Sequence, residues 1–132
     1  MKTGRTQPLH ADLANTAAWV NRVRERLAVT WVRPDAADFL NGWSNRGAPY
    51  LPATAYHTGG RVYLEGVVAG GTLGAALFTL PDPFRPTATV HFLVAAGGAA
   101  ATLEVDAEGN VTVSGGSNTA VQLDGVTYWS KR

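Results

Sequence analysis

The sequence has 132 residues, a length that fits one domain plus a short extension. Hydrophobic residues make up 45% of it and charged residues 16%, so the chain is too apolar to be disordered. A net charge of +1 gives no electrostatic basis for binding nucleic acid, and the lack of cysteine excludes disulfides, zinc–thiolate sites and a thiol nucleophile. No apolar run suggests a signal peptide or membrane insertion.

Charge divides the chain into two parts. Residues 1–38 are rich in charge, whereas residues 47–103 contain only Arg61, Glu65, Asp82 and Arg85. Pro34 lies at the transition, and it disfavours helical dihedrals at the residue before it. We therefore expect an N-terminal arm and helix at residues 1–34 and a separate head at residues 35–132.

The front part has the pattern of one helix. Asp12 is a suitable N-cap, and residues 13–29 contain no glycine or proline. Between Leu9 and Thr30, apolar residues and threonines follow one another at alternating steps of four and three, as in a coiled-coil seam. The alternative is an ordinary amphipathic helix that lies on its own domain. We expect self-association as a homotrimer through the seam residues Leu13, Thr16, Val20, Val23 and Leu27.

After Pro34 the pattern changes to a period of two. In residues 61–68, Val62 and Leu64 alternate with Arg61, Tyr63 and Glu65, which predicts a strand with one wet face. Similar segments separated by turn residues predict a mainly β fold, an antiparallel β-sandwich or jelly-roll head preceded by the N-terminal α-helix. These further strands are expected at residues 76–80, 87–96, 100–106, 110–114, 119–123 and 125–130.

The low charge of the head suggests a hidden uncharged surface, because solvated surfaces usually carry about 25–35% charged residues. A subunit interface would supply one. The segment at residues 97–101, Gly-Gly-Ala-Ala-Ala, fits either a close approach between protomers or a hairpin within one protomer.

The sequence contains no recognisable catalytic or cofactor site. His10, His57 and His91 lack metal-ligand spacing, and no serine is flanked as Gly-x-Ser-x-Gly. Glu104, Asp106 and Glu108 alternate and would share one strand face, where a solvated acidic edge is favoured over a calcium site. We therefore expect no enzymatic activity, no cofactor and no metal.

Exposed aromatic residues are the remaining candidates for binding. Tyr63 and Tyr128 belong to this group, but the preferred candidates for stacking on sugar rings are Tyr50, Tyr56 and Trp129. The alternative role for each is packing at a strand end or interface.

The order of short motifs in the head resembles a family of small β-rich head domains on tailed-bacteriophage virion proteins, which include tail-fibre, baseplate-associated, minor tail and head-fibre proteins. The resemblance covers residues 40–128, but Pro83 replaces the glycine usual before the aromatic-Arg-Pro turn. The motifs are Leu40-Asn41-Gly42-Trp43-Ser44-Asn45, Tyr56 followed by residues 60–66, Phe78-Thr79-Leu80-Pro81 with Phe84-Arg85-Pro86, Gly109-Asn110-Val111, and residues 123–128.

The resemblance implies a trimeric, non-enzymatic head at the virion surface, as a capsid decoration or head fibre or as a tail adhesin. Its partners would be major capsid or tail proteins and host-surface glycans. The cationic side chains expected to dock the N-terminus to the virion are Arg5, Arg22, Arg24 and Arg26. Two alternatives remain open. A lectin-like module is one, and an envelope-polysaccharide depolymerase, with Glu65 and Asp82 as its only central acids, is the other.

Overall fold

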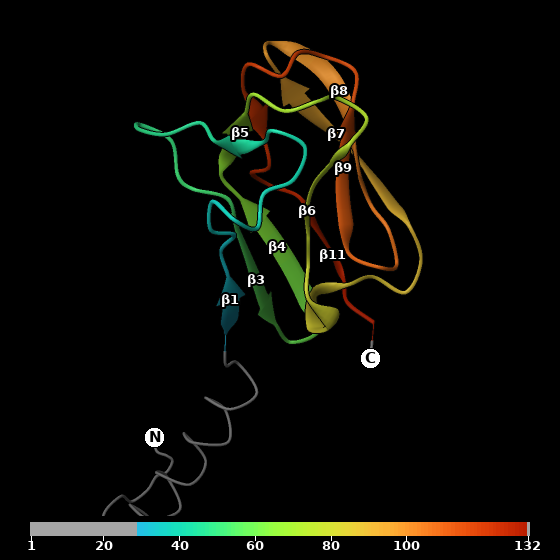
Figure 1. Cartoon of the computed structure of the whole chain (residues 1–132). Coiled ribbons are helices and arrows are strands. Elements are labelled where there is room, and N and C mark those ends of the chain that lie inside the picture. Colours follow the sequence, from blue (N-terminus) through green and yellow to red (C-terminus); the bar gives the residue numbers. More distant parts are fainter. Residues whose placement is uncertain (1–28, 132) are drawn as a thin grey trace, which may run out of the picture.

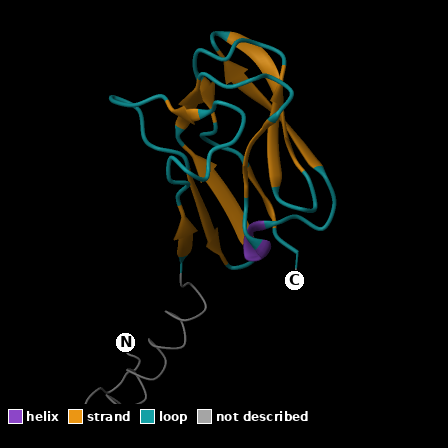
Figure 2. Cartoon of the chain, viewed as in Figure 1, coloured by secondary structure: helices purple, strands orange, loops and turns teal. Residues whose placement is uncertain are grey.

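The computed structural model describes residues 29–131, which form two antiparallel β-sheets (Figures 1 and 2). Four strands make up the first sheet in the order β1-β3-β4-β11, and seven make up the second in the order β2-β5-β10-β7-β8-β9-β6. Within this range the one helical segment is the 3₁₀ turn η1 (Asp82–Phe84), and no helix has the length and hydropathy to cross a membrane.

The strands are short, as is usual for a sheet connected by many turns. In the four-stranded sheet they are β1 (Thr30–Val32), β3 (Thr54–Thr58), β4 (Arg61–Glu65) and β11 (Thr127–Trp129). In the seven-stranded sheet they are β2 (Ser44–Asn45), β5 (Val67–Ala69), β6 (Ala76–Thr79), β7 (Val90–Ala96), β8 (Ala99–Val105), β9 (Asn110–Ser114) and β10 (Val121–Gln122). The predicted mainly β, antiparallel head is therefore confirmed.

One hydrophobic core lies between the two sheets. On β4, Val62 and Leu64 are buried while Tyr63 between them is exposed, as the period of two requires. Leu103 and Val105 on β8 follow the same alternation and belong to the same buried cluster as Val62 and Leu64. Because the inner faces of both sheets contribute to one cluster, the sheets pack face to face as a sandwich.

The segment predicted as one strand at residues 61–68 is in fact two strands, β4 and β5, in different sheets. The change occurs at Gly66, which has a φ of +110°. A β-carbon there would lie 2.5 Å from the carbonyl oxygen of Pro52, so only glycine fits. The Gly66 N–H donates a hydrogen bond to Asp124 Oδ1 at 2.8 Å, which fixes the crossing point.

The sheet begins before the boundary expected at Pro34. Strand β1 pairs with β3, and Trp31 lies opposite Tyr56. Thr30, the last position of the predicted seam, is therefore part of a strand, because it pairs in the ladder with His57. The helix expected at residues 13–29 lies outside the described residues apart from Val29, which is not helical.

Strands β1, β2 and β3 were not among the predicted strands. In β3 the inward positions are occupied by Ala55 and His57. Because neither is a large apolar residue, β3 lacks the alternation of apolar and polar residues by which the other strands were predicted. His57 lies in β3, where its Nε2 is 2.9 Å from Ser130 Oγ. The glycines of residues 97–101 form the turn between β7 and β8, so this segment is a hairpin within the chain.

Candidate functional site

Four aromatic side chains lie on the outer face of the four-stranded sheet, one from each strand. They are Trp31 on β1, Tyr56 on β3, Tyr63 on β4 and Trp129 on β11, and we call this set the aromatic face. The side chains of Trp31, Tyr63 and Trp129 are exposed at 55%, 44% and 59%. Because large apolar groups are normally buried when they have no partner, this concentration on one face indicates a binding surface.

The strand register brings these side chains into rows. Trp31 is opposite Tyr56, which is itself opposite Tyr63, so three rings cross three neighbouring strands. Trp129 is opposite Arg61 in the next row. Adjacent strands are about 4.8 Å apart, so the rings stand close enough together to contact one extended ligand.

Two arginines stack on the tryptophans at opposite edges of this sheet. The guanidinium of Arg33 lies 5.0 Å from the centroid of the Trp31 ring, and its Nε donates a hydrogen bond to Thr54 Oγ1 at 3.0 Å. The guanidinium of Arg61 lies 4.7 Å from the centroid of Trp129 and donates from Nε to Thr127 Oγ1 at 2.9 Å. Among residues 29–131, the carboxylates within salt-bridge distance of a basic side chain are Glu104, beside His91, and Asp82, beside Lys131, so neither arginine is paired with a carboxylate there.

The one carboxylate on the aromatic face is held by a tyrosine. Tyr56 donates its hydroxyl hydrogen to Glu65 Oε2 at 2.9 Å. This hydrogen bond is the main reason that the pKa of Tyr56 is raised above its ordinary value. Glu65 is therefore hydrogen-bonded within the face, and Arg33 and Arg61 are the two cationic side chains of the face.

A groove runs along the free edge of β11, and we call it the edge groove. One side is formed by Arg61, Thr127 and Trp129, and the other by residues 86–92, which lead into β7. Its volume is about 540 Å³, within the range of small-molecule binding sites. The edge groove joins the aromatic face at Trp129, so the two form one continuous candidate site.

The structure brings together two of the three predicted glycan-binding residues. Tyr56 and Trp129 both lie on the aromatic face. Tyr50 lies elsewhere, in the loop after β2 that projects from the body in Figure 1, where Arg46 stacks 6.0 Å from its ring. The predicted oligomerisation and virion-docking residues lie outside the described residues.

Sequence reasoning overlooked Trp31 and Arg61 as site residues and did not select Tyr63. The alternation at residues 61–65 already placed Arg61 and Tyr63 on the same wet face, so this signal was available. Trp31 carried no such signal because it was assigned to the end of the helical part. Tyr128, which was grouped with the exposed aromatics, is buried at 4% exposure, because its ring points into the core.

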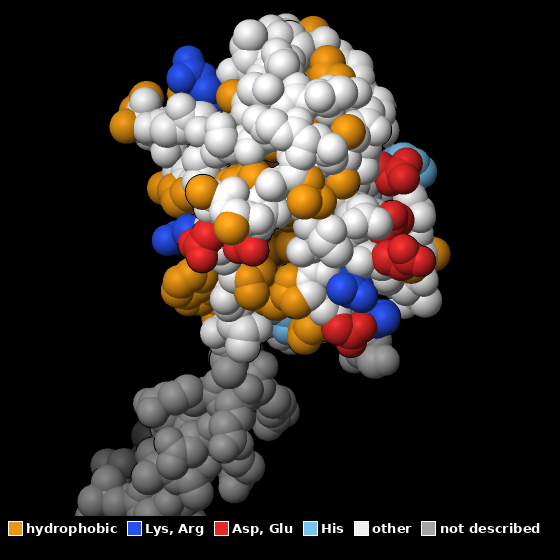
Figure 3. Space-filling view, viewed as in Figure 1, with side chains coloured by type: hydrophobic (Ala, Val, Ile, Leu, Met, Phe, Trp, Pro, Cys, Tyr) orange, Lys and Arg blue, Asp and Glu red, His pale blue; other side chains and the backbone are white. Residues whose placement is uncertain are grey.

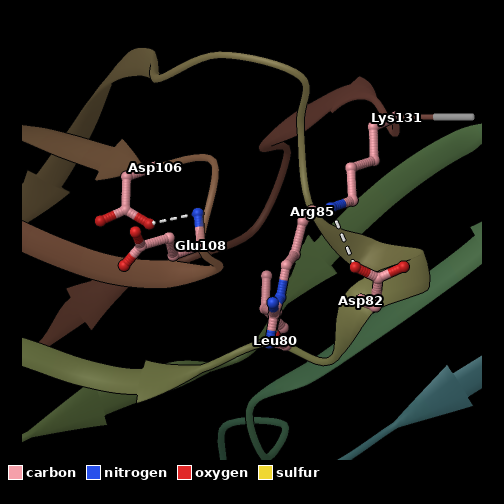
Figure 4. Close-up of polar contacts among 6 residues, drawn as sticks. All are labelled: Leu80, Asp82, Arg85, Asp106, Glu108 and Lys131. Carbon is pink, nitrogen blue, oxygen red and sulfur yellow. Dashed lines mark hydrogen bonds and ion pairs between the residues drawn. The ribbon is translucent and has the colours of Figure 1, made fainter.

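The three alternating acids do not converge into a site. Glu104 lies 3.0 Å from His91. Asp106 accepts a hydrogen bond from the N–H of Glu108 in the β8–β9 turn (Figure 4) and a second one from the N–H of Asn110. The strand ends at Val105, so the predicted shared face does not extend to Asp106 and Glu108. No cluster of three potential metal ligands occurs within residues 29–131.

Several of the motif residues contact one another and hold turns in place. Arg85 Nε donates to the carbonyl oxygen of Leu80 at 2.8 Å, and Leu80 N–H donates to the carbonyl oxygen of Gly109. Lys131 N–H donates to the carbonyl oxygen of Arg85, and Lys131 Nζ pairs with Asp82 at 2.9 Å (Figure 4). These contacts join the segment around η1, the β8–β9 turn and the C-terminal strand. These motif residues therefore stabilise the fold and do not form the candidate binding site.

Charged side chains are unevenly spread over the surface. On the face shown in Figure 3, most acidic side chains lie at mid-height and below, and the upper part of the molecule carries little charge. This agrees with the sequence, since residues 92–103 contain no charged side chain. The aromatic face and edge groove differ from this uncharged region because they contain Arg33 and Arg61, which are not paired with a carboxylate of residues 29–131.

Comparisons with known proteins place the fold. No model of a known protein family matches the sequence, and no curated protein matches it. Among solved structures, the chain is similar to the crystal structure of the receptor binding protein (gp15) of Listeria phage PSA, with a TM-score of 0.70 and 19% sequence identity. The similarity covers 98% of this chain and 83% of that chain. The β head therefore has the fold found in a phage receptor-binding protein, as the motif order indicated.

Proposed function

We propose that this protein is a non-enzymatic structural protein of a tailed bacteriophage, displayed on the virion surface, whose aromatic face binds glycans of the host envelope. The fold shared with a phage receptor-binding protein and the order of the head motifs support the virion assignment. The observation that carries the binding assignment is the alignment of Trp31, Tyr56 and Tyr63 across three strands, with Trp129 beside them.

Aromatic rings of this kind suit sugars because a sugar ring offers C–H groups on one side and hydroxyls around its rim. A flat aromatic ring contacts the C–H side, while nearby polar groups contact the hydroxyls. The aromatic face supplies both, since Thr127 and Arg61 lie between the exposed rings of Tyr63 and Trp129. A trimer would present three such faces, and the resulting avidity would strengthen weak individual contacts.

The head projects outward in this proposal, and the N-terminal part attaches to the particle. Residues 1–28 carry the docking arginines Arg5, Arg22, Arg24 and Arg26 and the coiled-coil seam from Leu13 to Leu27. They enter the head at β1, an edge strand of the sheet that bears the aromatic face. The attachment partner is a major capsid protein or a tail protein.

A depolymerase activity has less support than binding. Glu65 accepts a hydrogen bond from Tyr56 on the aromatic face, whereas Asp82 lies in η1 and pairs with Lys131. Glycoside hydrolysis needs two carboxyl groups about 5–9.5 Å apart on either side of the scissile bond. Because these two acids belong to separate networks, we assign the site to binding.

Three experiments test the proposal. Immunogold labelling of particles that encode the protein should decorate the virion surface and show whether the label lies on the capsid or the tail. Deletion of residues 1–12 should abolish attachment to the particle and leave the head folded. Labelled full-length protein should bind host cells, and Trp129→Ala or Tyr63→Ala should weaken this binding at least tenfold, whereas Tyr50→Ala should not. Unlabelled particles would contradict the virion assignment, and equal binding by all variants would contradict the aromatic face.

A further inference from the structure

We infer that the edge groove recognises an acidic sugar, one that carries a carboxylate or phosphate group, with Arg61 as the residue that binds the anionic group. This inference rests on the proposed function and specifies the chemical class of glycan at one part of the site. Four observations support it: the charge of the groove, the restricted side chain of Arg61 with its available donors, the position of Trp129, and the backbone groups of β11 that do not bond to β4.

The edge groove has a positive charge and no acid to balance it. Arg61 is one of its lining residues, and the lining contains no aspartate or glutamate. His91 lies at its rim, and the nearest acid contact there, Glu104 Oε1, is already 3.0 Å from His91 Nε2. An anionic ligand would therefore meet no acidic side chain in the lining, and the carboxylate at the rim, Glu104, is hydrogen-bonded to His91.

Arg61 is held in place and still has free donors. Its Nε donates to Thr127 Oγ1 at 2.9 Å, and its guanidinium stacks on Trp129, so both contacts restrict the side chain. The Nε contact is the one side-chain hydrogen bond of Arg61 to residues 29–131, so its terminal N–H groups have no protein acceptor there. A restricted guanidinium loses less freedom when it binds, and its forked N–H groups match carboxylate and phosphate oxygens.

The other arginines of the head differ from Arg61 in their surroundings. Arg85 donates its Nε to the carbonyl oxygen of Leu80 and lies beside the Asp82–Lys131 pair. Arg46 stacks on Tyr50 in a projecting loop and lines a different pocket. Arg33 stacks on Trp31 at the opposite edge of the sheet and lines a different pocket. Among the arginines of residues 29–131, Arg61 alone combines an aromatic partner with the edge groove.

The backbone of β11 supplies further polar groups to the groove. Leu64 N–H donates to the carbonyl oxygen of Val126, and Ser130 N–H donates to the carbonyl oxygen of Gly60. The backbone N–H and C=O groups of residues 126, 128 and 130 therefore point toward β4. In an antiparallel ladder the alternate residues point the other way. The N–H and C=O groups of Thr127 and Trp129 therefore face the groove, where no other strand of residues 29–131 lies beside β11.

Together these groups can contact the apolar side, the anionic group and the hydroxyls of one sugar unit. The exposed ring of Trp129 contacts the apolar side of the sugar, and Arg61 beside it contacts the anionic group. The backbone of Thr127 and Trp129, with Thr87 and Thr89 on the opposite wall, bonds the hydroxyls. Neighbouring units of the same glycan would continue across Tyr63 on the aromatic face.

The test is binding of the full-length protein to an array of bacterial glycans that includes neutral polymers, uronate-bearing polymers and phosphate-bearing polymers as separate groups. We expect retention of one or both anionic groups and weaker binding as the salt concentration rises. Arg61→Gln should reduce this binding at least tenfold, and Arg61→Lys, which keeps the charge but loses the fork, should reduce it less. Arg46→Gln is the matched control, since it removes a stacked arginine elsewhere, and it should bind within twofold of wild type.

The outcomes separate this inference from the proposed function. Binding of neutral glycans that depends on Trp129 but not on Arg61 would overturn the acidic-sugar assignment and leave glycan binding intact. Equal loss in Arg46→Gln and Arg61→Gln would overturn the role of the groove. Retention of no glycan in any group would contradict glycan binding itself. Circular dichroism of each variant checks that the fold is unchanged.

Discussion

The hydroxyl of Tyr128 donates a hydrogen bond to the backbone carbonyl oxygen of Phe84 at 2.7 Å, and both residues are buried. The bond joins the last strand, β11, to the η1 turn, and it places the outward-facing neighbours Thr127 and Trp129 beside the edge groove. Burial raises the pKa of Tyr128 well above its ordinary value, so the hydroxyl keeps its proton and can donate at neutral pH.

Tyr128→Phe should lower the stability of the head. The substitution keeps the ring but removes the donor, which leaves the Phe84 carbonyl oxygen buried without that partner. We expect a loss of about 1–3 kcal/mol in the free energy of unfolding, measured by urea denaturation. Tyr63→Phe is the control, because Tyr63 is exposed on the aromatic face, and it should change stability by less than about 0.5 kcal/mol. Equal stability of Tyr128→Phe and wild type would show that the bond contributes nothing.

Gly66→Ala should be far more damaging than a similar change at Gly125. Both glycines have positive φ angles, +110° and +88°, so alanine is strained at either position. At Gly66 the new β-carbon would also lie 2.5 Å from the carbonyl oxygen of Pro52, whereas nothing lies within 4 Å of it at Gly125. We expect a cost of about 1 kcal/mol for Gly125→Ala and a cost above about 3 kcal/mol, or failure to fold, for Gly66→Ala.

Soluble expression and thermal denaturation distinguish the two glycine variants. A Gly66→Ala protein as stable as Gly125→Ala would mean that the chain crosses between the sheets in a different way from the one described here.

The contribution of Asp106 to stability should depend on pH. Partial burial favours its neutral form, but hydrogen bonds from Asn110, Glu108 and Gly109 outweigh burial and lower its pKa below the ordinary value. Because the folded-state pKa is the lower one, this stabilisation is present above the unfolded pKa of about 4 and is lost as pH falls through the folded pKa. We expect Asp106→Asn to be about 0.5–1 kcal/mol less stable than wild type at pH 7.

The difference between Asp106→Asn and wild type should shrink as the pH falls below about 4. Denaturation at pH 7 and at pH 3 measures it. Glu108→Gln is the control, since Glu108 takes part in the turn through its backbone N–H, and it should match wild type at both pH values. A difference that grows in acid would mean that the sign assigned to the pKa shift is wrong.

The predicted N-terminal coiled-coil seam implies a trimer, and two charged substitutions in the seam should dissociate it. Val20→Asp with Leu27→Asp places like charges at equivalent seam positions, where apolar burial otherwise contributes about 1.5–3 kcal/mol per side chain. We expect light scattering to give the mass of a trimer for wild type and of a monomer for the double variant. Ala18→Asp, on the opposite side of the predicted helix, is the control and should remain a trimer. A monomeric wild type or a trimeric double variant would contradict the coiled coil.

The sequence by itself determined the fold class and much of the strand order along the chain. Period-two alternation is a local property, so Val62 and Leu64 could be assigned to the core and Tyr63 to the surface without any structure. The turn residues between segments marked where most strands end. The order of the head motifs also pointed to a phage virion protein, and the fold is similar to that of a phage receptor-binding protein.

Only the tertiary structure decided how the strands divide between two sheets and which side chains meet. The crossing at Gly66 depends on the close approach of Pro52, and β1 is a strand because it pairs with β3, so neither follows from the local pattern. The same long-range pairing places Trp31 in line with Tyr63 and sets Arg61 against Trp129. Tyr50 and Tyr128 resemble these aromatics in sequence, but one lies in a separate loop and the other fills the core, because packing and not residue type decides where a ring points.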